Sequence, residues 1–464
     1  MLVAGLLLIH RSVYSQEFPI AAGSDTTFSG GAVYGGENGL VAVCGDSSSE
    51  FSITAQLVGV TGTSGYLIGP RISLGAYGVP PGAATIFDGA NYFLVWRDFS
   101  NNLVGQFVNT SGNLVGTAFT IASDVALEQK HTPQVVYGDS TIIVAYVKTD
   151  GYLYARRVSK SGSLPGTEIQ VVNSPARDFS ISFDGTNYLV AWVDDVYEKN
   201  ISGQFISEGG SLVGNSFSID DGPNYSDNPT ALAYDGTRYL LAYHEAPTLS
   251  SSWTLMAKFI TTAGETGDTF TISDSSTHPS FPSVAFDNAN YLITWGQTSN
   301  NSQMGRFFNT SGFPIDTPFV VFGSLGKKFP LGGVGFGGGL YLAVTTRVDS
   351  NLSDGDVFAR FIQPLVTGIT GRPKIEAGSY ALFQNYPNPF NPSTLISYYL
   401  PEGSRVVLTM FDCLGRQVGT LVNERLGAGT HSVRFNAASL PSGVYFYKLQ
   451  AGNFTGVRKM ILVK

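Results

Sequence analysis

Cysteine is scarce in this sequence, which holds only Cys44 and Cys413 among 464 residues. The two fall in different predicted domains, so we expect no disulfide bond and a fold stabilised by packing alone. No cysteine pair has zinc-ligand spacing, and His131, His244 and His278 are scattered along the chain, which disfavours a zinc site.

Long hydrophobic runs are also lacking. The apolar run at residues 1–9 is too short to span a bilayer, and no other stretch suits a membrane helix, so we predict no transmembrane segment. Val13 and Ser15 offer small residues at cleavage positions before Gln16, so residues 1–15 are predicted to be a signal peptide. A buried N-terminal strand is the alternative.

Charge is sparse and unevenly distributed. Charged residues make up 13% of the chain and hydrophobic ones 43%, which is the balance of a globular protein. The net charge is −8, and residues 379–464 hold 8 basic and 3 acidic side chains, or +5, which leaves −13 for residues 1–378. This acidic main body argues against nucleic acid or an anionic membrane surface as a partner.

Catalytic and cofactor motifs are missing or incomplete. No G-x-S-x-G elbow occurs, and residues 333–338 match the dinucleotide pattern G-x-G-x-x-G without a helix to follow. Residues 349–356 have the acidic spacing of a calcium loop, but the glycine comes one residue late, so we expect a solvated turn, with calcium as the alternative. We predict no catalytic set, no cofactor and no metal.

A repeat of about 50 residues makes up most of the chain. In one copy, Phe183 precedes the turn dipeptide Asp184-Gly185, the chain returns over residues 188–192, and residues 201–219 hold a second hairpin. Four antiparallel strands per copy are typical of a propeller blade. The seven copies align on one aromatic residue before the turn, at Tyr34, Phe87, Tyr137, Phe183, Tyr234, Phe286 and Phe336.

The two ends of the array predict a closed ring. The seventh copy lacks its fourth strand, and residues 18–21 before the first copy match residues 119–122, which form a fourth strand in the second copy. An N-terminal strand that completes the last blade would remove two exposed sheet edges. We therefore predict a seven-bladed β-propeller over residues 16–365.

Large aromatic residues recur at one position of the repeat, nine residues after the turn aromatic. A carbohydrate platform is one interpretation of such a stripe, but repetition at one structural position favours packing between blades. The residues are Trp96, Tyr146, Trp192, Tyr243 and Trp295.

The loops of the repeat divide into two kinds. Those within each hairpin repeat closely and predict a scaffold face, where aspartates such as Asp184 serve as turn formers. The others, predicted to lie on the opposite face, vary in length and content, as binding loops on a rigid scaffold do, although drift in unconstrained loops is an alternative. The candidate ligand-binding residues, on predicted loops of the fourth to sixth blades, are Asp194, Asp195, Tyr197, Tyr225, His244, Glu245, Trp253 and His278.

After a predicted linker at residues 366–379, the sequence changes in kind. Prolines punctuate residues 387–392 and exclude a helix there, and six short alternating strands follow. The pattern predicts a small antiparallel Ig-like β-sandwich over residues 380–464. The fold class expected for the whole chain is therefore all-β.

Residues 380–464 resemble the C-terminal sorting domain of the bacterial type IX (Por) secretion system. The matching motifs are QNYPNPFNP at 384–392, FD at 411–412, LGR at 414–416, AG with His431, LPSGVYFY at 440–447, and Lys459-Met460. The resemblance implies export through the inner membrane by the signal peptide and passage across the outer membrane guided by this domain. It also implies that the domain is commonly removed, with release or surface attachment of the protein. It implies recognition roles for Gly443, Tyr445 and Lys459.

Together these features favour a secreted or cell-surface binding propeller with a glycan or protein ligand. One alternative is a secreted polysaccharide hydrolase or lyase that uses loop carboxylates such as Asp195 and Glu245. Another is a structural surface-layer component that associates with itself.

Overall fold

The computed structural model divides into two compact units, unit 1 at Met1–Leu365 and unit 2 at Val366–Lys464. It describes residues 15–364 and 380–462, except for 22–25, 36–37, 48–49, 62–63, 77–82, 127–131, 195–199, 223–224, 249–251, 274, 324–332, 349–354, 383–384, 386–392 and 428. The two units are described separately below.

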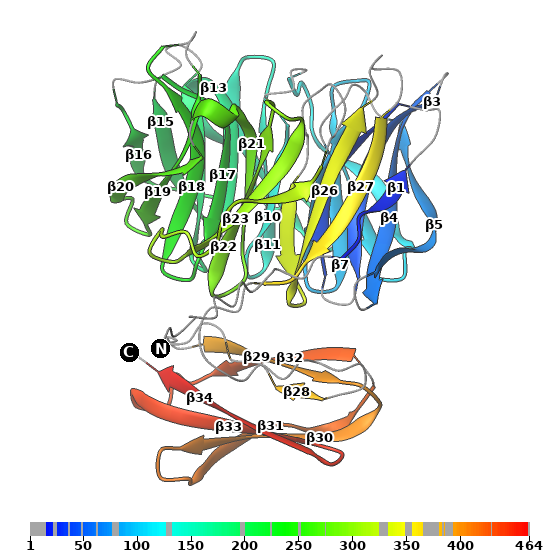
Figure 1. The fold of residues 1–464 in the computed structure, drawn as a ribbon, viewed down its shortest axis with the longest axis vertical. Coiled ribbons are helices and arrows are strands. Elements are labelled where there is room, and N and C mark those ends of the chain that lie inside the picture. Colours follow the sequence, from blue (N-terminus) through cyan, green and yellow to red (C-terminus); the bar gives the residue numbers. More distant parts are fainter. Residues whose placement is uncertain are drawn as a thin grey trace, which may run out of the picture. The chain divides into compact units, whose positions relative to one another are not determined.

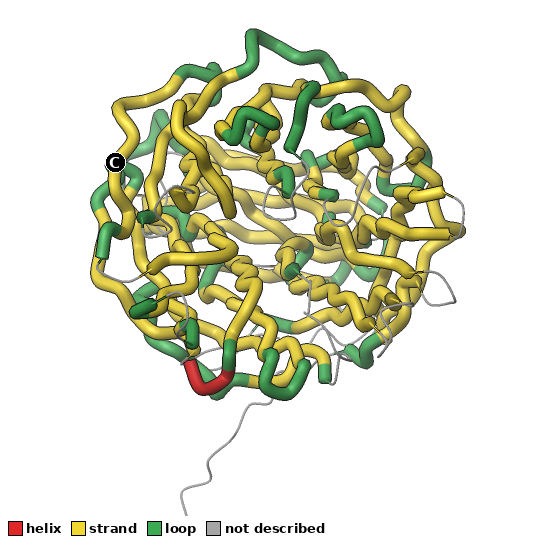
Figure 2. Tube along the Cα trace, turned by 90° about the horizontal axis from the view of Figure 1, so that it is seen from above, coloured by secondary structure: helices red, strands yellow, loops and turns green. Residues whose placement is uncertain are grey.

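Strands form nearly all of the regular structure (Figure 2), as the sequence predicted for an all-β protein. The one helical element among the described residues is a short 3₁₀ turn, η2 (Ser275–Thr277). No helix long and apolar enough to cross a membrane occurs in the part of the chain that the structure describes.

Three sheets of unit 1 have four antiparallel strands each, in chain order. Such up-and-down sheets follow from short turns between consecutive strands. The first is β6 (Ala84–Phe87), β7 (Asn91–Arg97), β8 (Leu103–Asn109) and β9 (Leu114–Ala122); the second is β17 (Tyr225–Tyr234), β18 (Arg238–Ala246), β19 (Thr254–Thr261) and β20 (Thr266–Ser273); the third is β21 (Pro279–Phe286), β22 (Asn290–Gln297), β23 (Ser302–Asn309) and β24 (Phe319–Phe322).

Two larger sheets complete unit 1. In the seven-stranded sheet, the long strand β13 pairs with β12 through its first part and with β14 through its second part, so it joins two groups of four strands. Its strands are β10 (Gln134–Tyr137), β11 (Thr141–Val147), β12 (Tyr152–Ser159), β13 (Ile169–Phe183), β14 (Asn187–Asp194), β15 (Ile201–Ser207) and β16 (Leu212–Asp220).

The remaining sheet joins the beginning of unit 1 to its end. Its order is β25-β26-β27-β2-β3-β4-β5, with β1 also paired to β27, and one parallel bridge between Thr26 and Gly355 links β2 to β27. Its strands are β1 (Phe18–Ala21), β2 (Thr26–Tyr34), β3 (Gly39–Ser47), β4 (Glu50–Thr61), β5 (Ser64–Ala76), β25 (Val334–Gly337), β26 (Leu340–Val348) and β27 (Gly355–Ile362).

The N-terminal strand lies where the sequence predicted. β1 pairs antiparallel with β27, with Phe18 opposite Ala359, and in Figure 1 the dark blue strand lies beside the yellow one. Ser15 extends this pairing, because its N–H donates to the Phe361 carbonyl (3.0 Å) and its Oγ accepts from the Phe361 N–H (2.9 Å). The signal peptide predicted for residues 1–15 would include Ser15, and its other residues lie outside the described ones.

Asp-Gly turns connect the first two strands of several groups. Asp184 Oδ1 accepts hydrogen bonds from the N–H groups of Thr186 and Asn187, both at 2.7 Å. Gly185 has φ +93°, a conformation that glycine adopts without a Cβ clash. Asp88, Asp235 and Asp287 bond their turns through Oδ1 in the same way, so the aspartates are turn formers, as predicted.

The repeated aromatic residues pack between neighbouring groups of strands. Trp192 of β14 is 1% exposed and shares a buried cluster with Ile143 of β11 and Leu153 of β12. Trp96 joins residues of β3 and β4, and Trp295 joins residues of β18 and β19. The packing interpretation of the aromatic stripe is confirmed.

Unit 2 contains two antiparallel sheets, β28-β29-β32 and β31-β30-β33-β34. Both contribute to one buried cluster, to which Tyr398, Leu408 and Tyr447 belong. The strands are β28 (Ala381–Leu382), β29 (Ser393–Leu400), β30 (Ser404–Asp412), β31 (Gln417–Leu426), β32 (Gly429–Asn436), β33 (Gly443–Ala451) and β34 (Phe454–Leu462). β29 to β34 correspond to the six strands expected from the sequence.

Candidate functional site

Two ends of unit 1 follow from its antiparallel strands. In each group of four strands, the connection between the first and second strands and the one between the third and fourth strands lie at the same end. This end is here called the turn end, and it carries turns such as Asp184–Asn187 and Asn109–Asn113. The connection between the second and third strands and the connection to the next group of strands lie at the other end, here called the loop end. The described part of the loop end includes residue 200 and residues 221–222, 247–248, 252–253 and 275–278.

At the turn end, neighbouring groups are tied together by hydrogen bonds. Asn38 Nδ2 donates to the Thr110 carbonyl (2.8 Å), and Lys160 Nζ donates to the Asp88 carbonyl (2.7 Å). Arg238 also donates to the Thr310 carbonyl. In each case the first turn of one group meets the third connection of the next, so these loops are fixed parts of the scaffold, as their repetition predicted.

A repeated tyrosine, which the sequence analysis did not single out, forms a second hydrogen bond between neighbouring groups at the turn end. Tyr188 Oη donates to the Thr141 carbonyl of the preceding group (2.9 Å), and Tyr341 Oη donates to the Asn290 carbonyl (3.2 Å). Burial raises the pKa of both hydroxyls, so they stay protonated donors at ordinary pH. The signal in the sequence is a tyrosine at the start of the second strand in several copies.

The loop end holds the candidate ligand-binding residues, but the structure corrects their setting. Of the candidates that the structure describes, only Trp253 and His278 lie on loops. Asp194 ends β14, Tyr225 begins β17, and His244 and Glu245 belong to β18. These strands are longer than the sequence pattern indicated, because backbone pairing, as between Tyr225 and Ala246, continues to their ends. Asp195 and Tyr197 lie outside the described residues.

Asp194 is half-buried at the end of β14 and has a supporting contact. Its Oδ1 accepts a hydrogen bond from Trp192 Nε1 at 3.1 Å. Partial burial raises the pKa of this carboxyl, against the lowering effect of its bonds to Trp192 and Ser202. The carboxylate therefore orients the repeated tryptophan, and its raised pKa is a property shared with general acids.

His244 is buried, with 3% of its surface exposed, and lies opposite Asp227 and Leu255 in the sheet. A ligand at the loop end cannot reach it without a structural change. Glu245, the next residue along β18, is half-buried, as is Trp253. Trp253 therefore offers a partly accessible aromatic ring in this group of strands, whereas His244 does not offer its ring.

His278 is exposed and has φ +48°, which is uncommon for a residue with a Cβ. Its carbonyl accepts hydrogen bonds from the Thr298 N–H (3.2 Å) and Thr298 Oγ1 (3.1 Å). The backbone is thus held by a neighbouring loop while the ring stays accessible.

A buried charged pair near Asp194 was missed by the sequence analysis. Arg177 Nε lies 3.9 Å from Asp178 Oδ2, both residues are almost fully buried, and the pairing of β13 with β14 is irregular between Arg177 and Ser180. Asp178 has φ +45°. The signal that would have found them is a pair of adjacent charges directly before Phe179 and Ile181 of the predicted strand.

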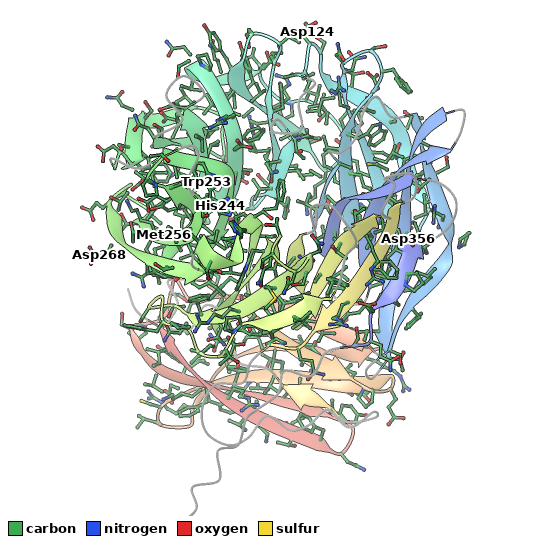
Figure 3. The ribbon with its side chains drawn as sticks, turned by 45° about the horizontal axis from the view of Figure 1, so that its top comes forward. Asp124, His244, Trp253, Met256, Asp268 and Asp356 are labelled. Atoms are coloured by element: carbon green, nitrogen blue, oxygen red, sulfur yellow. The ribbon has the colours of Figure 1, made fainter. Side chains whose placement is uncertain are left out.

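The acidic stretch considered for calcium is described only at Gly355 and Asp356, which belong to β27. Figure 3 shows Asp356 on the other side of unit 1 from His244 and Trp253. Within the described ranges, no three histidine, cysteine, aspartate or glutamate residues are grouped to hold a metal ion.

The three residues of unit 2 that the resemblance implies in recognition have different surroundings. Gly443 begins β33 and is exposed, and Lys459 is exposed on β34 opposite Phe446. Tyr445 is 5% exposed and its Oη donates to the Pro441 carbonyl at 2.7 Å. Tyr445 is therefore a core residue, and Lys459 is the residue of the three that offers an accessible side chain.

The comparison with protein families agrees with the resemblance of the tail. Residues 384–464 match the family described as the secretion system C-terminal sorting domain. Such a domain implies export by the type IX secretion system to the cell surface or beyond it. No curated protein matches the chain.

Several solved structures are similar to unit 1 at low sequence identity. AofleA from Arthrobotrys oligospora is 12% identical, with 67% of this chain and 90% of that chain covered at a TM-score of 0.44. The β-propeller domain of the trilobed protease from Pyrococcus furiosus is 9% identical, with 72% and 95% covered at 0.43. The Aleuria aurantia lectin is 12% identical, with 66% and 97% covered at 0.41.

Proposed function

We propose that this protein is a secreted or surface-displayed binding protein whose unit 1 holds a glycan or protein ligand at its loop end. Unit 2 serves its passage through the type IX machinery, with Gly443, Tyr445 and Lys459 as recognition positions. The observation that carries the proposal is the contrast between a hydrogen-bonded, repetitive turn end and a non-repetitive loop end.

Unit 1 in this proposal is a closed ring of seven blades, residues 16–365. The supporting contact is one that recurs between neighbouring groups, a phenylalanine ring resting on a turn glycine. A Cβ added to Gly162, Gly264 or Gly312 would lie 3.1, 3.3 or 2.9 Å from Phe119, Phe217 or Phe270. The pair Phe18 and Gly65 repeats this contact between the last group and the first.

The groups that we assign as blades each contain four strands. They are β2–β5; β6–β9; β10–β12 with the first part of β13; the rest of β13 with β14–β16; β17–β20; β21–β24; and β25–β27 with β1. For residues 380–464 we propose an Ig-like sandwich, because the two sheets share one buried cluster. The intervening residues 366–379 are the proposed linker.

The loop end supports binding because it offers side chains of the types that bind polar ligands. Trp253 is a half-buried aromatic residue and His278 is an exposed donor and acceptor, from two neighbouring groups of strands. Aromatic rings supply rigid contact area for sugars and proteins, and the polar groups fix orientation.

A glycan array and a surface-protein pull-down on the secreted full-length chain would test this proposal. Trp253→Ala and His278→Ala should each weaken the binding of any ligand found by about tenfold. Phe313→Ala is the matched control, because Phe313 is a 67% exposed aromatic residue at the turn end. Equal loss in the Phe313→Ala variant, or no loss in either loop-end variant, would contradict the assignment.

Asp194 gives the enzyme alternative its specific support, because burial raises its pKa. A polysaccharide hydrolase or lyase would need a second carboxylate, and Glu245 at the end of β18 is the described candidate. Reducing-sugar release by the secreted protein, abolished in Asp194→Asn and in Glu245→Gln, would establish the enzyme and replace the binding proposal.

Export is tested separately from ligand binding. Removal of residues 380–464 should leave a protease-resistant unit 1 in the periplasm, because the sorting domain match covers nearly all of the removed segment. Normal secretion of the truncated chain would refute the sorting assignment. Self-association of the secreted protein in light scattering would favour a surface-layer component.

A further inference from the structure

Unit 2 has a cavity of about 510 Å³ on one side of its four-stranded sheet. A volume of this size is in the range that holds small molecules. Arg405 and Arg425 both line it, and they are directly opposite each other on β30 and β31. Its other polar lining includes Tyr380, Glu402 and Gln450.

The two arginines are an unusual pair for a stable sheet. Like charges directly opposite each other on neighbouring strands are destabilising, because their side chains lie side by side. Arg405 donates to Asn423 Oδ1 at 3.0 Å, and among the described residues of unit 2 neither arginine forms an ion pair. An anion between the two guanidinium groups would remove this repulsion.

 Tyr380, which also lines the cavity, is held by contacts within unit 2. The ring of Tyr380 stacks on Phe454, with centroids 5.8 Å apart and an interplanar angle of 13°. Tyr380 Oη lies 2.6 Å from Ser404 Oγ and donates to Glu402 Oε1 at 3.2 Å. These contacts fix the tyrosine and the glutamate before any ligand arrives, which reduces the entropy lost on binding.

We propose that this cavity binds the phosphate group of a phosphorylated sugar. Arginine forks match phosphate oxygens in charge and geometry, and a phosphate monoester offers enough oxygens for both guanidinium groups. Glu402 carries a negative charge at the same cavity, so it suits sugar hydroxyls, which donate to it, and Gln450 can bond further hydroxyls. The excess of basic residues in residues 379–464 favours an anionic ligand over a cationic one.

Calorimetry on the purified full-length protein, with residues 380–464 intact, tests this site with D-glucose 1-phosphate, glucose and inorganic phosphate as probes. We expect saturable binding of glucose 1-phosphate, weaker binding of inorganic phosphate, and none of glucose. Arg405→Gln and Arg425→Gln should each weaken the binding by about tenfold or more, because each removes a charged donor. Both arginines are exposed, so the variants should fold normally.

Lys448→Gln is the matched control, because it removes one positive charge from β33, opposite Val457 and Thr409 and outside the cavity. It should change the affinity by less than about twofold, since exposed charges beyond the first contact are screened. Absence of saturable binding by the unaltered protein, or an equal loss in Lys448→Gln, would overturn the proposal.

The source of the phosphate group is resolved by a second set of probes, phosphatidylcholine vesicles with and without phosphatidic acid. Co-sedimentation that needs phosphatidic acid and both arginines assigns the site to a lipid headgroup. Binding of glucose 1-phosphate without co-sedimentation assigns it to a soluble sugar phosphate. Both results support the phosphate site, and neither depends on the ligand of unit 1.

Discussion

The turn end and the loop end of unit 1 are built from the same strands but are held in different ways. At the turn end, side chains such as Asn38 and Lys160 bond the backbone of the neighbouring group, and the same kinds of contact recur around the unit. At the loop end, Trp253 and His278 have no counterparts in other copies of the repeat. Repeated positions should therefore determine stability, and loop-end positions should determine binding.

The largest expected effect comes from the repeated tryptophan. Trp192→Ala should lower the free energy of unfolding by about 3–5 kcal/mol, because it leaves a cavity between two groups of strands. Chemical denaturation measures the loss. Trp253→Ala is the matched comparison, and its loss should be within about 1 kcal/mol because the side chain is only half-buried. Similar losses of stability in both variants would contradict the distinction between repeated positions and loop-end positions.

The next effect concerns closure of unit 1 by β1. Gly65→Ala should cost about 1–3 kcal/mol, because the added Cβ would lie 1.9 Å from Phe18 Cε1 and displace the ring. Thermal unfolding and protease digestion near the N-terminus measure it. Gly222→Ala at the loop end is the control, since its new Cβ would meet nothing closer than 3.9 Å. An unchanged melting temperature in Gly65→Ala would show that Phe18 does not secure the closure.

A smaller loss of stability is expected when a hydrogen bond of the repeated tyrosine is removed. Tyr188→Phe removes the donor to the Thr141 carbonyl and leaves that buried acceptor without this bond, so it should cost about 1 kcal/mol. Denaturant titration is sensitive enough to resolve it. Tyr66→Phe is a suitable control because Tyr66 is 47% exposed, and a loss as large as that of Tyr188→Phe would contradict the role of the Tyr188 hydrogen bond.

The smallest effect is a pH dependence at the turn end. Burial raises the pKa of Asp316 from 3.8 to about 6, although its Oδ1 accepts from the Phe307 N–H at 2.8 Å. Because the folded state holds the proton more tightly than the unfolded state, this carboxyl lowers the stability as the pH rises between these two values. Asp316→Asn keeps an acceptor and removes the charge.

The Asp316→Asn variant should therefore melt at a higher temperature than the unaltered protein above pH 6, and at a similar temperature near pH 4. Melting curves across this range, taken for both proteins, give the difference directly and cancel the titration of other carboxyls. A constant difference at all pH values would show that Asp316 does not titrate in this range.

Much of the fold could be predicted because its signals are local. The Asp184-Gly185 turn and the alternating strands indicated hairpins. The missing fourth strand of the seventh copy indicated that Phe18 pairs with the last sheet, and the structure places Phe18 opposite Ala359. The motifs from Gln384 onward were specific enough to identify the sorting domain. These features depend on neighbouring residues, so a single chain displays them.

The candidate site was less predictable. His244 and Glu245 follow an apolar strand and precede a stretch rich in serine and proline, which suggested a loop. Pairing of β18 with β17 and β19 extends the strand through both residues and turns His244 inward. Arg177 and Asp178 were overlooked because adjacent charges usually mark an exposed position, whereas their burial depends on the pairing of β13 with β14.

By itself, the sequence determined the repeat, the turns, the all-β class and the route of export, since each of these is encoded in short motifs or in a periodic pattern. Only the tertiary structure decided which side chains face solvent and which meet across strands. It buries His244, exposes His278, and brings Arg405 opposite Arg425. Strand register and burial depend on contacts between residues far apart in the chain, and no local pattern specifies them.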